Sequence, residues 1–265
     1  MKAIINYPGS KWRLASWIIN HFPSHHSYLE PFFGSGAILF NKPRSPIETI
    51  NDLDGNVVNL FEWIRKDPER LARELYLIPY ARKVYDDTFK IKSDDRFQQA
   101  VTFCIRLNMG YGFRTTGEKC GWKRDVQSRE AAYAARNWTT LPERVFQAAE
   151  RLRGVQIENR EAMDVIQEYN SPKVLVYADP PYVWDTRQKK QYKYEMYDEK
   201  QILLLDVLLA HKGPVLISGY DNVLYQDRLC GWHREEMISY ALSHGKRKEI
   251  LWMNFEAESQ LSLFQ

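Results

Sequence analysis

Short strand-like runs alternate with helical patterns along much of this chain, and this alternation restricts the fold more than any other feature. The runs are rich in apolar, β-branched and aromatic residues and are bounded by turn-forming residues. We predict strands at residues 27–30, 48–52, 155–159, 174–177, 214–219 and 249–255, and helices at 12–22, 57–66 and 200–210. Strands that alternate with helices are typical of a doubly wound α/β fold with a Rossmann-like sheet.

The alternation stops between about residues 68 and 154, where helical periodicity and one loop at 109–125 replace it. At 265 residues the chain has room for one sizeable domain with an insertion. We expect residues 1–60 and 155–265 to form the main domain and residues 61–154 to form an inserted, mainly helical domain.

The inserted segment is basic. Between Phe103 and Arg153 ten basic side chains face only five acidic ones, although the net charge of the whole chain is only +3. Aromatic residues such as Tyr111 and Trp122 are interleaved with these charges. This composition suits a polyanionic partner. The alternative is a solvated helical face without a binding role.

Several classes of protein are disfavoured. No apolar run approaches the ~18 residues that a membrane span needs, and residues 1–6 lack the apolar region of a signal peptide. We therefore expect a cytoplasmic protein without a membrane partner. Cys104, Cys120 and Cys230 lie far apart and lack CxxC spacing, which indicates neither a disulfide framework nor a metal site.

The predicted strand at 174–177 ends in Asp179-Pro180-Pro181-Tyr182. Prolines donate no hydrogen bond and fix φ, so this turn is stiff and its carbonyl groups are free to accept. The Asp179 carboxylate and the Pro180 carbonyl can accept the two hydrogens of an exocyclic amine, whose lone pair then points at an electrophile. Tyr182 supplies a flat face for a planar base. The alternative is a proline turn with an aspartate cap.

Two further motifs follow predicted strands. Gly34 and Gly36 permit the tight turn and the close ligand approach that nucleotide-binding folds need after a first strand. Asp52 ends the next strand, where an acidic residue accepts hydrogen bonds from ribose hydroxyls. Asp54 is better placed to cap the helix that follows, so Asp52 is our candidate for the ribose.

Together these motifs resemble the N6-adenine DNA methyltransferases of the Dam type (D12 class). The resemblance rests on Tyr7-Pro8-Gly9-Ser10-Lys11, Glu30-Pro31-Phe32-Phe33-Gly34-Ser35-Gly36, Asp52 and Asp179-Pro180-Pro181-Tyr182, in that order. It covers residues 1–60 and 155–265. The insert resembles the family only loosely: it reads Arg106-Leu107-Asn108-Met109-Gly110-Tyr111-Gly112-Phe113-Arg114, where the best-known members carry a related Arg-x-Asn-x-x-Gly pattern followed by a different loop.

The resemblance implies a methyltransferase that uses S-adenosylmethionine. Its cofactor-binding residues here would be Tyr7, Lys11, Phe32, Gly34, Gly36, Asp52 and Asp179. Its catalytic residues would be Asp179, Pro180 and Tyr182, with no metal and no covalent intermediate. The target adenine N6 is paired inside duplex DNA, so the base must be flipped into the pocket, where Tyr182 would stack on it.

The resemblance also implies that the insert is the target-recognition domain of an enzyme that acts on double-stranded DNA. We expect this enzyme to be a monomer in solution. We predict that a hairpin-like segment within it contacts DNA through Asn108, Arg114, Lys119, Lys123 and Arg124. The stretch Arg187-Gln188-Lys189-Lys190 is the alternative recognition segment.

Other functions stay open on the residues alone. A turn that can bind an amine does not identify which amine it binds, so cytosine N4, RNA and a protein side-chain amide are alternative substrates. A non-catalytic DNA-binding protein is another. Asp at position 179 and the motif order favour DNA adenine. A cytosine-C5 enzyme would need a Cys nucleophile, typically after Pro, and no Cys here follows Pro.

Overall fold

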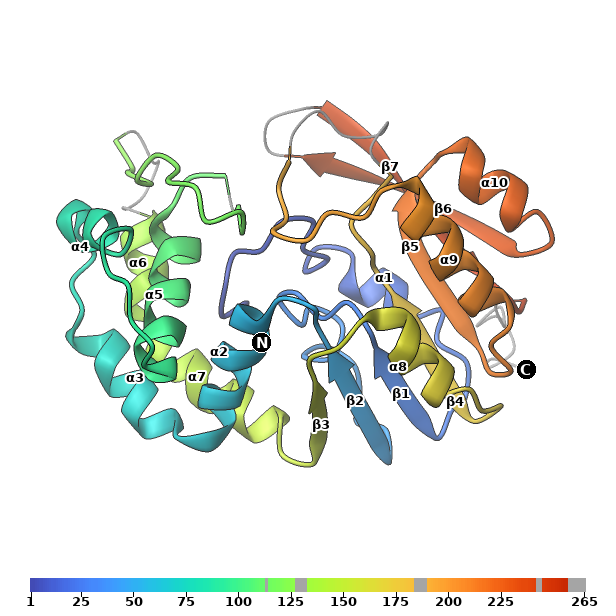
Figure 1. Ribbon diagram of the computed structural model, residues 1–265, viewed down its shortest axis with the longest axis horizontal. Coiled ribbons are helices and arrows are strands. Elements are labelled where there is room, and N and C mark those ends of the chain that lie inside the picture. Colours follow the sequence, from blue (N-terminus) through green and yellow to red (C-terminus); the bar gives the residue numbers. More distant parts are fainter. Residues whose placement is uncertain (113, 127–132, 184–189, 242–244, 257–265) are drawn as a thin grey trace, which may run out of the picture.

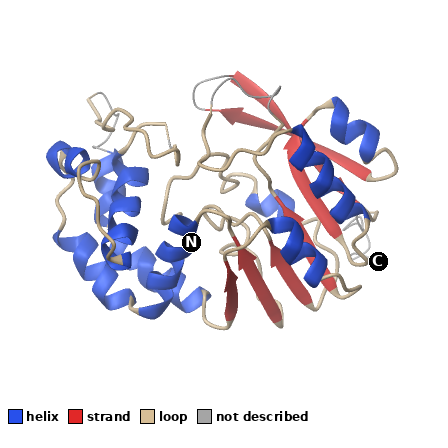
Figure 2. Ribbon diagram, in the orientation of Figure 1, coloured by secondary structure: helices blue, strands red, loops and turns tan. Residues whose placement is uncertain are grey.

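A computed structural model describes residues 1–112, 114–126, 133–183, 190–241 and 245–256. Its centre is a seven-stranded sheet with the order β3-β2-β1-β4-β5-β7-β6 (Figures 1 and 2). The strands are β1 (Ser27–Glu30), β2 (Ile47–Asn51), β3 (Val155–Glu158), β4 (Val174–Ala178), β5 (Val215–Tyr220), β6 (His233–Ala241) and β7 (Gly245–Met253).

Six of the seven described strands run in the same direction, and β7 runs antiparallel to them. β1 pairs in parallel with β2 and β4, with Ser27 opposite both Ile47 and Val174. β3 and β5 continue the parallel pattern, while β7 lies antiparallel between β5 and β6. Because β1, β2 and β4 are parallel neighbours, the residues that follow them meet at one edge of the sheet. The α/β fold class is confirmed.

Some of the helices begin at a residue whose side chain caps them. The Asp54 side chain accepts a hydrogen bond from the Asn56 backbone N–H, and Asp95 does the same for Phe97. The helices are α1 (Ala15–Ile19), α2 (Gly55–Lys66), α3 (Pro68–Leu77), α4 (Arg82–Asp87), α5 (Arg96–Met109), α6 (Tyr133–Thr139), α7 (Leu141–Arg151), α8 (Ala162–Glu168), α9 (Asp198–Leu209) and α10 (Val223–Arg228). Among the described residues, none of these helices is long and apolar enough to span a membrane.

Two apolar clusters cover the two faces of the sheet. β4 is buried along its whole length and contributes Leu175 and Tyr177 to one cluster. It contributes Val174, Val176 and Ala178 to the other, which also holds apolar residues of α8 and α9. Alternate side chains of a strand point to opposite faces, so this central strand needs apolar residues at every position. Burial therefore fixes the place where β4 ends and the Asp-Pro-Pro-Tyr turn begins.

Helices α3 to α7 gather at one side of the sheet, at the left of Figure 1. Their core is continuous with that of the sheet, since Val101 and Leu107 belong to the same buried cluster as Ile4, Ile5 and Phe61. The helical segment predicted between the second and third strands is thus present. The boundaries at residues 61 and 154, and a recognition role for this segment, stay predictions.

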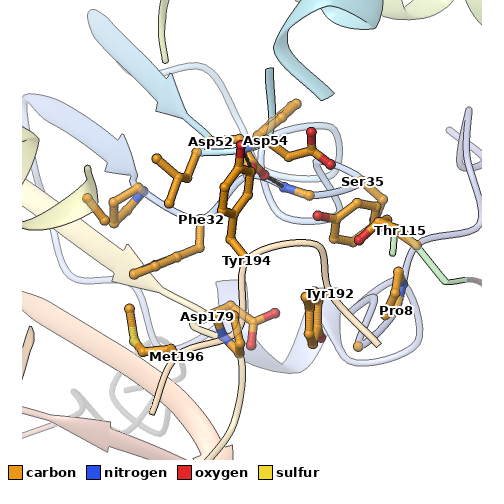
Figure 3. A pocket seen from close by; sticks show the side chains of 18 of the residues that line it. Pro8, Phe32, Ser35, Asp52, Asp54, Thr115, Asp179, Tyr192, Tyr194 and Met196 are labelled. Carbon is orange, nitrogen blue, oxygen red and sulfur yellow. Dashed lines mark hydrogen bonds between the residues drawn. The ribbon is translucent and has the colours of Figure 1, made fainter. Parts of the chain in front are cut away.

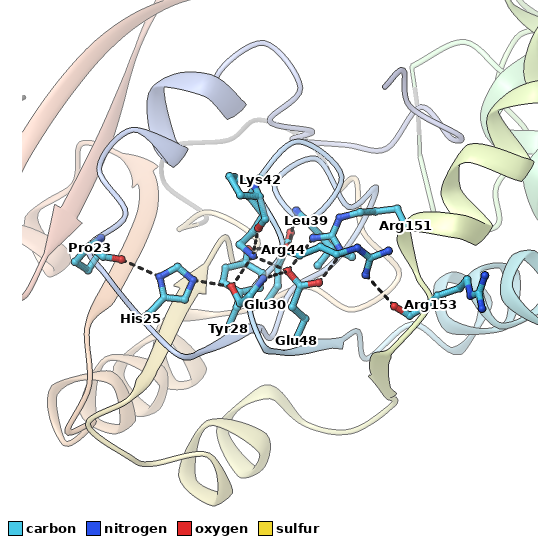
Figure 4. Close-up of polar contacts among 12 residues, drawn as sticks. Pro23, His25, Tyr28, Glu30, Leu39, Lys42, Arg44, Glu48, Arg151 and Arg153 are labelled. Atoms are coloured by element: carbon cyan, nitrogen blue, oxygen red, sulfur yellow. Dashed lines mark hydrogen bonds and ion pairs between the residues drawn. The ribbon is translucent and has the colours of Figure 1, made fainter.

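A buried ion cluster fixes α7 to the sheet (Figure 4). Glu48 on β2 accepts hydrogen bonds from Lys42 at 2.6 Å and from both terminal nitrogens of Arg151 at 2.5 and 2.8 Å. Burial alone would raise the pKa of Glu48, but these donors hold it at about 2. Arg44 donates to the carbonyls of Glu150 and Arg153 at the end of α7. The helical segment is therefore tied to the sheet by charge as well as by apolar packing.

The sequence-based prediction found five strands within about two residues, placed the start of β7 four residues too late, and missed β6. That strand lies at the edge of the sheet and carries Arg234, Glu235 and Glu236 in succession. Arg234 pairs with Asp221, and Glu236 pairs with Lys248 on β7. Edge strands tolerate such charges, which hide the apolar alternation on which the prediction depends. The helix predicted at 12–22 is also shorter, at Ala15–Ile19.

Candidate active site

A pocket of about 230 Å³ lies at the edge where β1, β2 and β4 end (Figure 3). It brings together residues that are far apart in the sequence. Of the predicted cofactor-binding residues, the lining includes Tyr7, Lys11, Phe32, Gly34, Asp52 and Asp179. Of the Asp-Pro-Pro-Tyr turn, Pro181 also lines it.

The Asp179 carboxylate enters this pocket with one oxygen already bonded. Its Oδ1 is 2.8 Å from the Lys11 ammonium and accepts a hydrogen bond from the Ser218 hydroxyl at 2.9 Å. No described residue donates to its Oδ2. The Asp179 side chain is 18% exposed. One carboxylate oxygen is thus held in place while the other remains available to a ligand.

Lys11 is a buried cation between two carboxylates. It is 4% exposed and lies 3.4 Å from Glu249 on β7 as well as 2.8 Å from Asp179. Its ammonium also donates to the Gly9 carbonyl and lies 4.6 Å from the centre of the Tyr182 ring. Burial alone would lower the pKa of Lys11, but the two carboxylates outweigh it and hold the pKa above its usual value. Lys11 therefore stays charged and orients Asp179.

Tyr182 is fixed at both its hydroxyl and its ring. The hydroxyl donates to Glu249, and the ring packs edge-on against Tyr220 with centroids 4.6 Å apart. Burial raises the pKa of Tyr182. The side chain is only 9% exposed and is not part of the pocket lining. Stacking of Tyr182 on a flipped base stays a prediction, and it requires one face of this ring to be uncovered.

Asp52 lines the pocket and also braces the glycine turn. Its Oδ2 accepts from the Gly34 backbone N–H and its Oδ1 from the Asp54 backbone N–H, both at 2.8 Å. Burial raises the pKa of Asp52 to about 7, although both donors act in the opposite direction. The expectation that Asp54 caps α2 is confirmed. Asp54 is 3% exposed, and its Oδ2 has no hydrogen-bond partner among the described residues.

The two glycines of the turn have different surroundings. Gly34 has φ +51, and a Cβ there would lie 2.9 Å from the Tyr7 ring, which borders the pocket. Gly36 has φ +69 and is not part of the lining, and its missing side chain makes room for Phe33 and Phe40 instead. The structure thus places Gly34 at the pocket and Gly36 against the core.

The loop at residues 190–196 lines the pocket on the side of the helical segment. Thr115 donates its backbone N–H to the Gln191 carbonyl, and its hydroxyl oxygen accepts from the Lys193 backbone N–H, both at 3.0 Å. Lys193 also lies 3.5 Å from Asp54. Sequence reasoning did not single out this loop, because nothing local marks residues 190–196 as neighbours of the glycine turn.

The loop after α5 has a hairpin-like base. Gly110 and Trp122 form an antiparallel bridge, and the backbone N–H groups of Tyr111 and Lys123 donate across it at 2.7 Å. Four of the predicted DNA-binding side chains lie in or beside this loop and are at least partly exposed: Arg114, Lys119, Lys123 and Arg124. Of the alternative stretch, Arg187, Gln188 and Lys189 lie outside the described residues.

Asn108 is placed differently from those four. Its amide nitrogen donates to the carbonyls of Ile4 and Cys104, both at 3.0 Å, and its oxygen accepts from Asn6. These bonds join α5 to the amino-terminal segment. Base reading by Asn108 stays a prediction, and it would require these bonds to be exchanged.

Three known proteins are similar to this chain along most of its length. The chain is 24% identical to a DNA adenine methylase of Escherichia coli K12, over 94% of this chain and 92% of that protein. It is 25% identical to the type II methyltransferase M.MjaIII of Methanocaldococcus jannaschii, over 96% and 99% of the two chains. A DNA adenine methylase of Serratia marcescens is 22% identical over 85% and 86%.

The family profile covers most of the chain. It matches residues 7–240, a span that runs from Tyr7 in the lining of the pocket through the Asp-Pro-Pro-Tyr turn and into β6. The chain belongs to the D12 class N6 adenine-specific DNA methyltransferase family.

Proposed function

We propose that this enzyme transfers a methyl group from S-adenosylmethionine to N6 of an adenine flipped out of duplex DNA. The observation that carries the proposal is the Asp179 carboxylate, whose Oδ1 is bonded to Lys11 and Ser218 while its Oδ2 faces no donor among the described residues. It lies in the same pocket as Phe32, Gly34 and Asp52, which the family resemblance assigns to the cofactor. A methyl donor and an amine can therefore meet beside a single acceptor.

The pocket fits the chemical groups of S-adenosylmethionine. Phe32 and Met196 supply apolar walls for a planar base, and Asp52 and Asp54 supply acceptors for ribose hydroxyls or an ammonium group. The buried, unpartnered Oδ2 of Asp54 needs a donor, because an unpaired buried acceptor costs about 1–3 kcal/mol. When bound, this cofactor supplies an electrophilic methyl group on a sulfonium centre.

Asp179 then acts on the amine. Its free Oδ2 accepts a hydrogen bond from one N–H of the amine, and the Pro180 carbonyl accepts one from the other N–H. The nitrogen lone pair is then left to attack the methyl group. Positive charge develops on this nitrogen during transfer, and a fixed carboxylate in a partly buried site stabilises that charge. Holding the reactants in line also makes the step effectively unimolecular. Lys11 and Ser218 contribute by preventing Asp179 from rotating.

The basic loop at residues 110–124 and the helices around it would bind the DNA. Its cations would contact phosphates, and side chains near Arg114 would read base edges. Thr115 connects this loop to the segment that lines the cofactor pocket. We also expect the enzyme to be cytoplasmic and monomeric, and light scattering with and without DNA tests the second expectation.

The decisive experiment is methylation of mixed-sequence duplex DNA with labelled S-adenosylmethionine, followed by mapping of the modified base. We expect N6-methyladenine at a defined sequence. Label on cytosine N4, or on RNA or protein offered in parallel, would replace the proposed substrate. Calorimetric titration with the cofactor distinguishes an inactive assay from a DNA-binding protein that has lost its cofactor site.

A further inference from the structure

A glutamine on α9 contacts the back of the catalytic turn. Gln201 is fully buried, at 0% exposure, on the helix face that also carries Leu204, Leu205 and Leu208. Its amide nitrogen donates to the Pro181 carbonyl at 2.6 Å. Its amide oxygen accepts from the Tyr225 hydroxyl of α10 at 2.7 Å. A polar side chain at this depth is favourable only because both its groups are paired.

The orientation of this amide follows from its partners. A carbonyl oxygen can only accept a hydrogen bond, so the Pro181 carbonyl requires the NH₂ end of Gln201. The oxygen of Gln201 must then face Tyr225, whose hydroxyl donates. Tyr225 is itself fixed, since it is 2% exposed and its ring packs edge-on against Trp252 at 5.2 Å. The Pro181 carbonyl thus sets the amide orientation, and Tyr225 holds the amide in it by donating to its oxygen.

The turn needs such support because two of its four residues have no N–H. Pro180 and Pro181 cannot form the backbone donor bonds that hold most turns. Side chains hold it instead. Lys11 and Ser218 bond Asp179, and Glu249 bonds Tyr182. Gln201 bonds the Pro181 carbonyl. Among the described residues, Gln201 is the one whose side chain bonds the backbone of the two prolines.

We propose that Gln201 is a positioning residue for methyl transfer, held in its working orientation by Tyr225. By occupying the Pro181 carbonyl it fixes the turn, so that the Asp179 carboxylate and the Pro180 carbonyl keep their directions toward the amine. This inference rests on the proposed function. It adds two residues, on α9 and α10, that touch neither substrate nor cofactor.

A purely structural role makes a different prediction. If Gln201 only joins α9 to the sheet, its loss lowers the melting temperature but leaves the turnover of folded enzyme unchanged. If it positions the turn, turnover falls even where the fold is intact. A displacement near 1 Å of a reacting group can reduce a rate by about 100-fold.

The test is Gln201→Leu, which removes both amide groups at similar volume. We expect kcat to fall about 10- to 100-fold, with the Kd for S-adenosylmethionine within about twofold of the original enzyme. The matched control is Leu204→Ala on the same buried face, which removes apolar volume but no hydrogen bond to the turn. We expect it to lower the melting temperature and to leave kcat unchanged at temperatures where the variant is folded. Unchanged kcat in Gln201→Leu, or an equal loss in the control, would overturn the proposal.

Tyr225→Phe decides the question if Gln201→Leu does not fold. It removes only the hydroxyl that bonds the Gln201 amide oxygen, and we expect a smaller, severalfold loss of kcat. In the double variant the loss should equal that of Gln201→Leu alone, since Tyr225 acts through Gln201. Normal kcat in Tyr225→Phe, or fully additive losses, would contradict the inference. Failure of the unaltered enzyme to methylate DNA would instead contradict the proposed function.

Discussion

The pocket at the sheet edge and the basic loop at residues 110–124 differ in how firmly their side chains are held. At the edge of the sheet, Lys11, Asp179, Tyr182 and Glu249 are buried or nearly so, and each is bonded to at least one of the others. In the loop at residues 110–124, the ammonium of Lys119 pairs with Asp86 although both side chains are at least 30% exposed. Arg114 reaches Glu118 only at 3.9 Å.

This difference matches two physical tasks. A catalytic group must be in place before the substrate arrives, because reorganisation during the reaction adds to the barrier. A phosphate-binding cation works from a solvated surface, where exposed ion pairs are worth about 0–1 kcal/mol and are readily exchanged for DNA. Substitutions at the sheet edge should therefore change the rate, and substitutions in the loop should change affinity and its dependence on salt.

The largest effect should follow the loss of Asp179. Asp179→Ala removes the acceptor for the amine, and we expect kcat to fall at least about 100-fold. The fold should survive, since the change removes a carboxylate at a strand end rather than core volume. Methyl transfer to DNA and the melting temperature, measured together, test this. Near-normal turnover would show that the firmly held region is not the catalytic one.

The positions of Asp179, Asp52 and Gly34 could be predicted because the signal is local. Each follows a strand whose burial shows in its own residues, and parallel strands bring such ends together. Glu249, Ser218 and Gln201 could not be predicted in this way. Each contributes through a partner at least 20 positions away, and none lies in a motif of its own. Glu249 gave one signal, an acidic residue at the start of an otherwise apolar run.

A smaller effect should follow the loss of Asp52. Asp52→Ala leaves the ribose hydroxyls poorly paired, and we expect cofactor binding to weaken by about 2 kcal/mol. DNA affinity should change much less. Asp95→Ala is a matched control, because its carboxylate also accepts a hydrogen bond from a backbone N–H but caps α5 outside the pocket lining. If calorimetry finds unchanged cofactor affinity, Asp54 becomes the candidate for the ribose.

Cofactor affinity should also depend on pH through Asp52. A carboxyl whose folded pKa is raised to about 7 stabilises the free protein most below pH ~4, and that contribution is lost as the pH rises through 7. The ionised form is the better acceptor for hydroxyl groups, so binding should strengthen over the same interval. We expect the Kd at pH 6 to be about tenfold higher than at pH 8. Asp52→Asn should remove this dependence, and a pH dependence that persists in it would assign the titration to another group.

The helical segment was predictable in class but not in detail. Its helices follow from apolar periodicity and from capping residues such as Asp67 and Asp95. Its attachment to the sheet depends on Arg151 and Glu48, which are 103 positions apart, and on the amide of Asn108. An Arg-x-Asn pattern in a basic segment looks the same from sequence whether its amide faces DNA or the protein interior.

The smallest effects should come from the exposed loop, and they separate two kinds of DNA contact. Lys123 lies beside the hairpin-like base, with its ammonium 5.6 Å from the Tyr133 ring. Lys123→Ala should weaken binding to every sequence and lower the slope of log affinity against log salt by about one unit. Lys173→Ala is the control, since this exposed lysine precedes β4 at the opposite edge of the sheet.

Arg114→Ala should instead relax preference at one base pair by about 1–3 kcal/mol. If alanine at Arg114, Lys119, Lys123 and Arg124 each leaves affinity, salt slope and preference unchanged, DNA is recognised elsewhere, and the contrast between a fixed catalytic edge and an adaptable basic loop fails.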